Sequence, residues 1–165
     1  MRLVKLVVPV AALIAGCASY SGSGLVPGQS TMEDVEAVRG RPTLVREGAD
    51  GGKTLWYPRL PLGRESFAAR IDRDGTLVSL DQRLTAQNIA RLRPNQSTAD
   101  DVLDILGPPF RVYQYPHMQR EAWEYQLRTP PSNTSLYVQL SPDRVVREVF
   151  QLQDLPSRGP SFGSG

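Results

Sequence analysis

Cysteine and histidine are almost absent from this chain, and each shortage excludes a kind of site. Among 165 residues, Cys17 is the only cysteine and His117 is the only histidine. A single thiol excludes an internal disulfide and a site built from several thiolates, and a single imidazole excludes a histidine-rich metal site. Stability therefore has to come from packing, and we expect no metal and no cofactor.

A short uncharged apolar run covers residues 6–15, after a basic start that contains Arg2 and Lys5. The run is shorter than the roughly 20 residues that cross a bilayer, and Pro9 interrupts it. A basic start followed by an apolar run and small residues is typical of a bacterial export signal. We therefore predict that residues 1–16 are a signal peptide that is removed.

The segment Leu13-Ile14-Ala15-Gly16-Cys17 resembles the lipobox of bacterial lipoproteins. The resemblance implies that Cys17 becomes the mature N-terminus and carries acyl chains, so that the lipid bilayer is a partner of the protein. Stable anchoring takes at least two anchoring signals, and a triacylated cysteine exceeds that requirement. An ordinary secretory signal that happens to contain a cysteine is the alternative.

Positive charge is also limited once the signal has gone. Arg2 and Lys5 leave with it, and the basic residues that remain of the 19 in the whole chain equal the 17 acidic ones in number. A formally neutral chain lacks the basic surface that neutralises nucleic-acid phosphates. We therefore expect no nucleic-acid partner.

Two segments rich in small residues flank the part that is expected to fold. Residues 17–24 are interpreted as a lipidated Cys17 followed by a flexible Ser/Gly tether, and residues 156–165 as a disordered tail. The part that folds therefore extends over residues 25–155. This length is enough for one ordinary domain or for two very small ones.

An internal repeat divides the folded part. Residues 25–35, LVPGQSTMEDV, recur as residues 92–102, LRPNQSTADDV, displaced by 67 positions. The same displacement pairs Trp56 with Trp123, and beyond the tryptophans a shift of two more residues is needed, which one small insertion would explain. We therefore predict two copies of one unit, over residues 25–84 and 85–155.

Each unit is predicted to contain a short helix. Ser30 or Thr31 is placed to cap the first one, with Glu33 three residues after Ser30 as a capping box requires, and Ser97 and Asp100 repeat this spacing. Apolar residues at helical spacing indicate the buried face, and a glycine ends each helix. These residues are Val35, Val38 and Gly40 in the first copy and Val102, Ile105, Leu106 and Gly107 in the second.

Each helix is expected to pack on a small antiparallel sheet. Alternation in residues 122–127 puts Trp123, Tyr125 and Leu127 on one face. Trp56 and Trp123 are predicted to fill the interface between helix and sheet. The fold class is thus α+β, a tandem repeat of two small units, each with short helices packed on one face of a 3–4-stranded antiparallel sheet. The predicted strands are 44–46, 54–57, 66–71, 76–83, 111–115, 121–127, 135–140 and 145–152, with a further helix at 85–91.

A Pro-Gly-Gln-Ser-Thr segment, a helix, Gly-x-Pro and strands with a tryptophan together resemble the SmpA/OmlA (BamE) family. The second copy matches better, although Asn95 replaces the usual glycine, and the family usually has a single unit. The resemblance implies an outer-membrane lipoprotein that faces the periplasm, with β-barrel assembly subunits among its candidate partners. Ala18 after the cysteine agrees with outer-membrane sorting in enteric bacteria. Tandem units also resemble secreted β-lactamase inhibitor proteins.

The sequence favours a non-catalytic protein-binding or scaffolding module over an enzyme. Asp100 and Asp101 lie where helix capping and the helix dipole explain them, and His117 lies in a predicted hairpin loop. The alternative function is a tethered inhibitor of an envelope enzyme. Exposed aromatic side chains are natural anchors for either kind of partner, although burial in the core competes with this interpretation. The predicted partner-binding residues are Tyr113, Tyr115 and Tyr137, with Phe110 as a further candidate.

Overall fold

The computed structural model describes residues 24–59, 64–129 and 132–154. The predicted signal peptide, Cys17 with most of its tether, and the predicted tail at 156–165 lie outside these ranges. Within them, no helix is both long and apolar enough to cross a bilayer.

The helices are α1 (Met32–Arg39), α2 (Ala86–Ile89) and α3 (Ala99–Leu106), with a 3₁₀ turn η1 (Pro116–Met118). The strands are β1 (Leu44–Glu47), β2 (Lys53–Pro58), β3 (Ser66–Ile71), β4 (Leu77–Gln82), β5 (Arg111–Tyr115), β6 (Arg120–Leu127), β7 (Thr134–Leu140) and β8 (Val146–Gln153).

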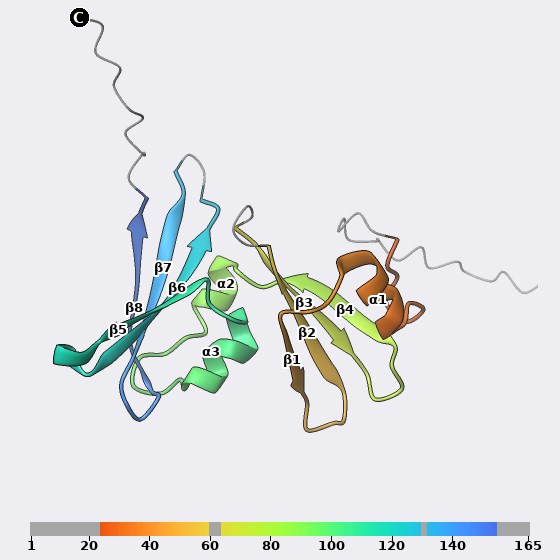
Figure 1. Cartoon of the computed structure of the whole chain (residues 1–165), viewed down its shortest axis with the longest axis horizontal. Coiled ribbons are helices and arrows are strands. Elements are labelled where there is room, and N and C mark those ends of the chain that lie inside the picture. The colour runs from red at the N-terminus through yellow and green to blue at the C-terminus, as the bar shows by residue number, and fades with distance from the viewer. Residues whose placement is uncertain (1–23, 60–63, 130–131, 155–165) are drawn as a thin grey trace, which may run out of the picture.

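Two four-stranded antiparallel sheets form the framework (Figure 1). The first sheet contains β1 to β4 and the second contains β5 to β8, and each strand pairs with the next one along the chain. Each pair of neighbouring strands is joined by a short connection, as expected for antiparallel meanders. The two sheets and their short helices agree with the predicted tandem α+β arrangement.

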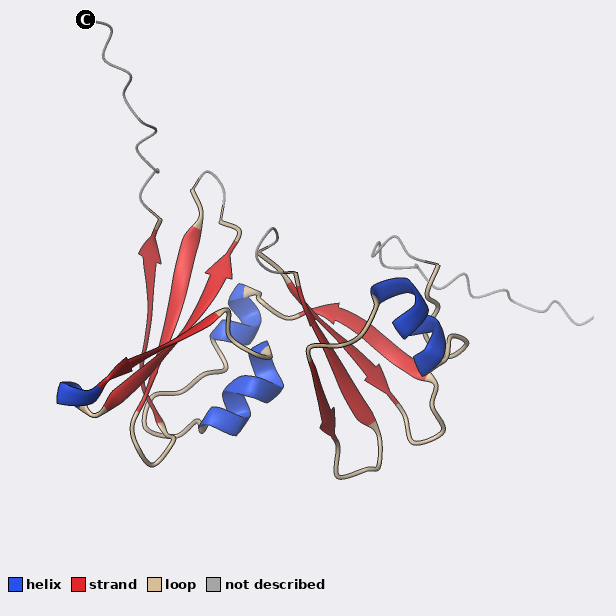
Figure 2. Cartoon of the chain, in the orientation of Figure 1, coloured by secondary structure: helices blue, strands red, loops and turns tan. Residues whose placement is uncertain are grey.

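The elements stack in layers. Figure 2 shows α2 and α3 between the two sheets, with α1 on the far side of the first sheet. Val35 of α1 shares a core with Leu55 and Ile71 of the first sheet. Val102 and Leu106 of α3 belong to the core of the second sheet. Each sheet thus has an inner face, which packs on its own helices, and an outer face on the opposite side.

The apolar stripe of α1 differs from the predicted one. Val35 is buried as predicted, but Val38 is 49% exposed, so the prediction for Val38 is wrong. Met32 packs on the core instead, and the Arg39 guanidinium lies 4.5 Å from the centre of the Phe67 ring. Positions 32, 35 and 39 face the sheet because residues three and seven apart share one side of a helix.

Threonine residues cap both long helices. Thr31 Oγ1 accepts a hydrogen bond from the Asp34 backbone N–H at 3.3 Å, and Asp34 Oδ2 accepts one from the Thr31 backbone N–H at 2.8 Å. Thr98 and Asp101 repeat this capping box, with distances of 3.2 and 2.7 Å. Each box satisfies two backbone donors that have no partner within the helix.

The serines that precede the caps have another role. The hydroxyls of Ser30 and Ser97 each accept a hydrogen bond from the backbone N–H four residues earlier, at 2.9 and 3.0 Å. They close the turn before the helix and are not available to cap it. The predicted capping boxes with Glu33 and Asp100 are therefore wrong by one residue.

The repeat is visible in backbone hydrogen bonds that tie the segment before each helix to the last strand of its sheet. Gly28 N donates to Leu77 O at 2.7 Å, and Asn95 N donates to Val146 O at 2.7 Å. Gly28 and Asn95 both have a positive φ, 79° and 63°. Asparagine tolerates this conformation better than most residues do, so the replacement of the expected glycine preserves the turn.

The two tryptophans are not equivalent in the structure. Thr43 N donates to Trp56 O at 2.9 Å, whereas Phe110 N donates to Glu124 O at 2.8 Å, so Trp56 corresponds to Glu124 and not to Trp123. Two single-residue insertions, one after β5 and one after β6, replace the single insertion that was predicted. A shift of one residue in the alignment moves each side chain of a strand to the opposite face of the sheet. Trp123 belongs to the core of the second sheet as predicted. Trp56 is also buried between a sheet and a helix, but the helix is α3 of the second unit and not α1 of its own unit.

Candidate functional site

The outer face of the first sheet is covered by the end of α3. Trp56 is 1% exposed although it belongs to neither core. A Cβ atom on Gly107, the residue after α3, would lie 2.6 Å from Trp56 Cζ3. The glycine backbone therefore lies directly on the indole ring, where a side chain would collide with it.

Two arginines also link the first sheet to α3. Arg46 of β1 pairs with Asp104 of α3 at 2.7 Å and with Asp100 at 3.4 Å. Arg83, which follows β4, donates hydrogen bonds to the carbonyl oxygens of Ile105 at 3.1 Å and Asp104 at 3.2 Å. A cation at the C-terminal end of a helix complements the helix dipole. The outer face of the first sheet around Trp56, Arg46 and Arg83 is therefore a contact surface with α3 within the chain, which we call the internal junction.

The outer face of the second sheet carries a row of aromatic side chains. The ring centres of Tyr113 and Tyr137 are 6.4 Å apart, and those of Tyr137 and Phe150 are 5.4 Å apart with an interplanar angle of 20°. These three side chains are half-buried, and Leu152 continues the row with 54% exposure. We call Tyr113, Tyr137, Phe150 and Leu152 the aromatic face. Helices α2 and α3 lie on the opposite side of this sheet (Figure 1).

A buried carboxylate lies within the aromatic face. Glu124 is 6% exposed. It accepts hydrogen bonds from the Tyr113 hydroxyl at 2.9 Å and from the Ser135 hydroxyl at 3.2 Å. Arg111 Nη1 donates to the Tyr113 hydroxyl at 3.0 Å. A buried charge is costly unless it is hydrogen-bonded, and these bonds fix the position of the Tyr113 ring.

The pKa values of two groups of this face, Tyr137 and Arg111, are shifted upward. Burial raises the pKa of Tyr137, and the negative charge of Glu124 raises it further. The hydrogen bond with Tyr113 raises the pKa of Arg111. At neutral pH the surface therefore offers apolar rings, the neutral Tyr137 hydroxyl and the Arg111 cation at its edge.

The outer faces of the two sheets are built differently. Trp56 occupies the position in the first sheet that Glu124 occupies in the second. In the first sheet, the Trp56 indole contacts Gly107 at the end of α3. If a helix end packed on the second sheet in the same way, it would contact the Glu124 carboxylate instead of an indole. The aromatic face is therefore not a second version of the internal junction.

The structure brings two of the predicted partner-binding residues together and separates the others. Tyr113 and Tyr137 are neighbours in the aromatic face. Tyr115 lies two residues after Tyr113 on the same face of β5, and it is 41% exposed at the end of that strand, with no ring stacked on it in the described residues. Phe110 lies elsewhere, beside Pro58 of the first sheet. The predicted anchor, Cys17, lies outside the described residues.

Sequence reasoning missed Phe150 and Glu124. Alternation along β8 indicates that Phe150 and Leu152 share a face, but it does not indicate which one. The face is set by the register with β7, where Tyr137 pairs with Phe150 and an irregularity follows Gln139. Glu124 has no local signal, because a charged residue within a strand normally indicates exposure.

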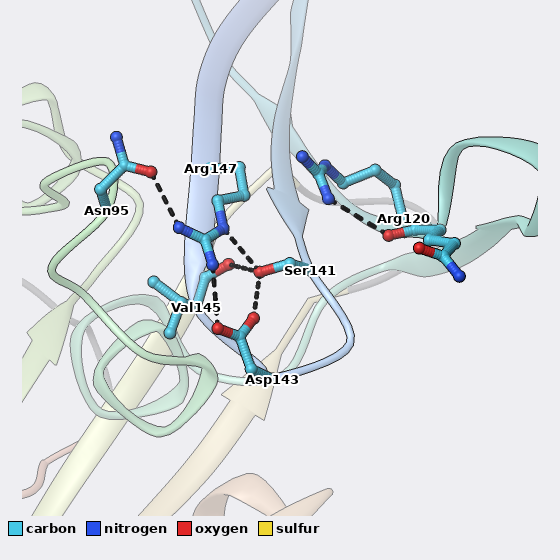
Figure 3. A network of polar contacts seen from close by, with 7 residues as sticks. Asn95, Arg120, Ser141, Asp143, Val145 and Arg147 are labelled. Atoms are coloured by element: carbon cyan, nitrogen blue, oxygen red, sulfur yellow. Dashed lines mark hydrogen bonds and ion pairs between the residues drawn. The ribbon is translucent and has the colours of Figure 1, made fainter.

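A second polar cluster lies in the turn between β7 and β8 (Figure 3). The Ser141 hydroxyl contacts the Asp143 carboxylate, lies 3.1 Å from the Val145 carbonyl oxygen, and accepts a hydrogen bond from Arg147 Nε at 2.7 Å. Arg147 also pairs with Asp143 at 2.9 Å and donates to Asn95 Oδ1 at 3.0 Å. These bonds close the turn and fasten it to the segment before α3, which is a structural role.

The remaining groups considered for chemistry lie apart from one another. His117 is exposed in η1. Asp101 caps α3, while Asp100 pairs with Arg46. In the ranges that the structure describes, no three histidine, cysteine or acidic side chains are placed to hold a metal ion.

Comparison with known proteins adds two similar structures. No family model matches the chain, and no curated protein matches it. A DUF4309 family protein (YjgB) from Bacillus subtilis shares 20% identity over 79% of this chain and 83% of its own, with a TM-score of 0.31. A putative beta-lactamase inhibitor protein from Streptococcus mutans shares 11% identity over 74% of this chain and 82% of its own, with a TM-score of 0.33. TM-scores this low assign neither a family nor a function, so the SmpA/OmlA resemblance stays a prediction.

Proposed function

We propose that the chain is a non-catalytic binding module that holds another envelope protein on its aromatic face. The observation that carries the proposal is the stack of Tyr137 and Phe150, 5.4 Å apart, beside Tyr113 on the side of the sheet away from α2 and α3. Aromatic side chains already held in place lose little conformational entropy on binding, and they dominate interface energies.

The chemistry of the face defines its partner. Contiguous exposed apolar surface rimmed by polar groups is typical of a protein interaction site. Arg111 lies at one edge, with its guanidinium 5.8 Å from the centre of the Tyr113 ring. A partner that packs an apolar side chain on the exposed side of the rings and places a carboxylate near Arg111 would satisfy both features.

The proposed location is the outer membrane, with the module facing the periplasm. The proposal is supported by the lipobox-like segment that ends at Cys17 and by the signal-like order of residues 1–16. Acyl chains on Cys17 would anchor the chain, and the rest of residues 17–24 would form the tether. Subunits of the β-barrel assembly machinery are the candidate partners that the family resemblance suggests.

Cell fractionation tests the anchor. Cys17→Ser is expected to lose the lipid mass and to move from the membrane fraction to the soluble fraction. Ser19→Ala, in the same segment, is the matched control and should stay with the membrane. A Cys17→Ser protein of unchanged mass that remains in the membrane fraction would show that the anchor is not there.

Affinity capture from cross-linked membranes tests the binding face. Phe150→Ser should reduce recovery of the partner at least about tenfold, because a central aromatic anchor contributes roughly 2 kcal/mol or more. Val45→Ser is the control, since Val45 is 44% exposed on β1 and lies outside the aromatic face. Equal recovery with the two variants, both shown to be folded, would contradict the proposal.

The identity of the captured protein separates the proposed scaffold from an inhibitor. Barrel-assembly subunits or porins would support a scaffolding module. A hydrolase that loses its activity in the complex would indicate instead a tethered inhibitor of an envelope enzyme. Both results require the aromatic face, so the Phe150→Ser comparison applies to either.

A further inference from the structure

A polar groove of about 490 Å³ opens between the outer face of the first sheet and the helices of the second repeat. One wall comes from β1 to β3 and includes Trp56, and the other includes Asp104 of α3 and Arg91, which follows α2. Four arginines line the groove: Arg46, Arg70, Arg83 and Arg91.

Two of these arginines already have partners. Arg46 pairs with Asp104 at 2.7 Å, and Arg83 donates to carbonyl oxygens at the end of α3. Within the described ranges, neither Arg70 nor Arg91 forms an ion pair with a carboxylate. In the described part of the chain, the groove therefore has two guanidinium groups on opposite walls that lack an ion-pair partner. Glu47 and Asp104 also line the groove, so its four arginines outnumber its acids two to one.

The charges in the groove repel one another. Burial lowers the pKa of Arg83, and the positive charges of Arg91 and Arg70 lower it further, against the opposing effect of Asp81. The guanidinium groups of Arg91 and Arg70 thus both act on that of Arg83, which lines the same groove. An anion placed between them would relieve this repulsion and gain charge-assisted hydrogen bonds.

We propose that the groove binds a phosphoryl group with two negative charges, held between Arg70 and Arg91 and beside Arg83. The planar fork of a guanidinium matches two phosphoryl oxygens at once. Donors on opposite walls suit a tetrahedral group with three free oxygens better than a planar carboxylate with two. Because Arg70 and Arg91 come from different copies of the repeat, the bound group joins the two walls. The site does not depend on the aromatic face.

The two tryptophans report on the site. Inorganic phosphate is titrated into the full chain while the indole N–H resonances are followed by NMR, with chloride at matched ionic strength as the reference. Trp56 lines the groove, whereas Trp123 belongs to the core of the second sheet. The Trp56 resonance should shift to saturation with phosphate but not with chloride, and the Trp123 resonance should stay in place.

Substitutions decide whether the groove arginines are responsible. Arg70→Gln and Arg91→Gln should each weaken phosphate binding at least about tenfold, through the loss of charge-assisted hydrogen bonds. Arg73→Gln is the matched control, because Arg73 lies in the turn after β3 and does not line the groove. Absence of a saturable Trp56 shift, or the same affinity in Arg70→Gln, Arg91→Gln and Arg73→Gln, would overturn the proposal.

Vesicles distinguish the two sources of a phosphoryl group. The full chain with Cys17→Ser, which has no acylation site, is pelleted with phosphatidylcholine vesicles that contain or lack phosphatidic acid. Pelleting that requires phosphatidic acid and is lost in Arg91→Gln would identify a lipid head group. Binding of free phosphate without such pelleting would identify a soluble phosphate compound. Either result supports the site, and binding to neither probe overturns it.

Discussion

Gly107 is the residue on which the junction between the two sheets most directly depends. It has a φ of 83°, and the equivalent Gly40 has a φ of 78°, a backbone region that favours glycine. Only Gly107 also faces an indole ring: a Cβ atom there would approach Trp56, whereas one on Gly40 would have no atom within 4 Å. Substitutions at Gly40 and Gly107 therefore distinguish the cost of backbone strain alone from the added cost of a collision with Trp56.

Alanine at the two glycines should have unequal effects. Gly40→Ala should lower the free energy of unfolding by about 1–3 kcal/mol through backbone strain. Gly107→Ala should lower it by a further ~1–3 kcal/mol, because the new methyl group overpacks against Trp56. Urea denaturation of both variants measures the difference.

A double-mutant cycle provides the control for this comparison. In a Trp56→Leu background the additional loss caused by Gly107→Ala should largely vanish, since the ring that causes the collision is gone. Equal losses for the two glycines in the wild-type background would show that the indole does not lie on Gly107.

Among the elements, α3 has a stability that depends on pH, because Asp101 is the acid of its capping box. Hydrogen bonds from the backbone and the side chain of Thr98 lower the pKa of Asp101 below its usual value of 3.8. The folded pKa is thus below the unfolded one. The stabilisation is therefore complete above the unfolded pKa and is lost as the pH falls through the folded pKa.

Asp101→Asn should therefore destabilise the protein in a pH-dependent way. At pH 7 its urea midpoint should lie below that of the wild type, and the difference should shrink as the pH falls below the usual carboxyl value of 3.8. Asp100→Asn is the control at pH 7, because Asp100 occupies the same turn without a capping bond. Its one ion pair in the described residues, with Arg46 at 3.4 Å, is largely exposed, so its effect should be smaller. A difference between Asp101→Asn and the wild type that persists unchanged in acid would contradict the assigned role.

The elements themselves could largely be predicted from the sequence, because their signals are local. The strands at 66–71 and 111–115 have the predicted bounds, and α3 ends before Gly107 as predicted, although it begins one residue later than the predicted Ser97 cap implies. The pairing between strands is not local. The single-residue insertion after β5 reverses the face of Trp56 relative to Trp123, and no pattern within either strand indicates this.

The aromatic face illustrates the same limit. Tyr113, Tyr137 and Phe150 come from three strands, and their contact depends on the register of β5 to β8. The sequence identified Tyr113 and Tyr137 as aromatic candidates, but only the sheet shows that Phe150 stacks on Tyr137. The contact of Gly107 with Trp56 depends in turn on how the two sheets pack together.

In the whole molecule, Trp56 joins two cores without belonging to either. Its neighbour Leu55 is fully buried in the core of the first sheet and is the matched comparison. Leu55→Ala should lower the free energy of unfolding by about 2–5 kcal/mol. Trp56→Ala should leave both cores folded and loosen the junction between them.

NMR relaxation measures this loosening. Backbone ¹⁵N relaxation rates should give one rotational correlation time for the wild type and two different ones, for residues 25–84 and 85–154, in Trp56→Ala. A single correlation time in Trp56→Ala, or loss of the first sheet to the same extent as in Leu55→Ala, would show that Trp56 acts as an ordinary core residue.

The outer faces of the two sheets differ, so we expect the two halves of the chain to have different roles. The outer face of the first sheet packs at Trp56 on the end of α3 and pairs Arg46 with its acids. The outer face of the second sheet carries the aromatic face around the buried Glu124. Binding of an envelope protein is therefore expected on the second sheet.

Site-specific photo-cross-linking in intact cells tests this expectation most directly. A photoreactive phenylalanine analogue is placed at Tyr137 in the aromatic face, and at the exposed Val45 of β1 as the control. We predict one discrete adduct with an envelope protein from position 137, its loss when Phe150→Ser is added, and no such adduct from position 45. An adduct with the same protein from position 45 and none from position 137 would contradict the assignment of the aromatic face as the binding surface.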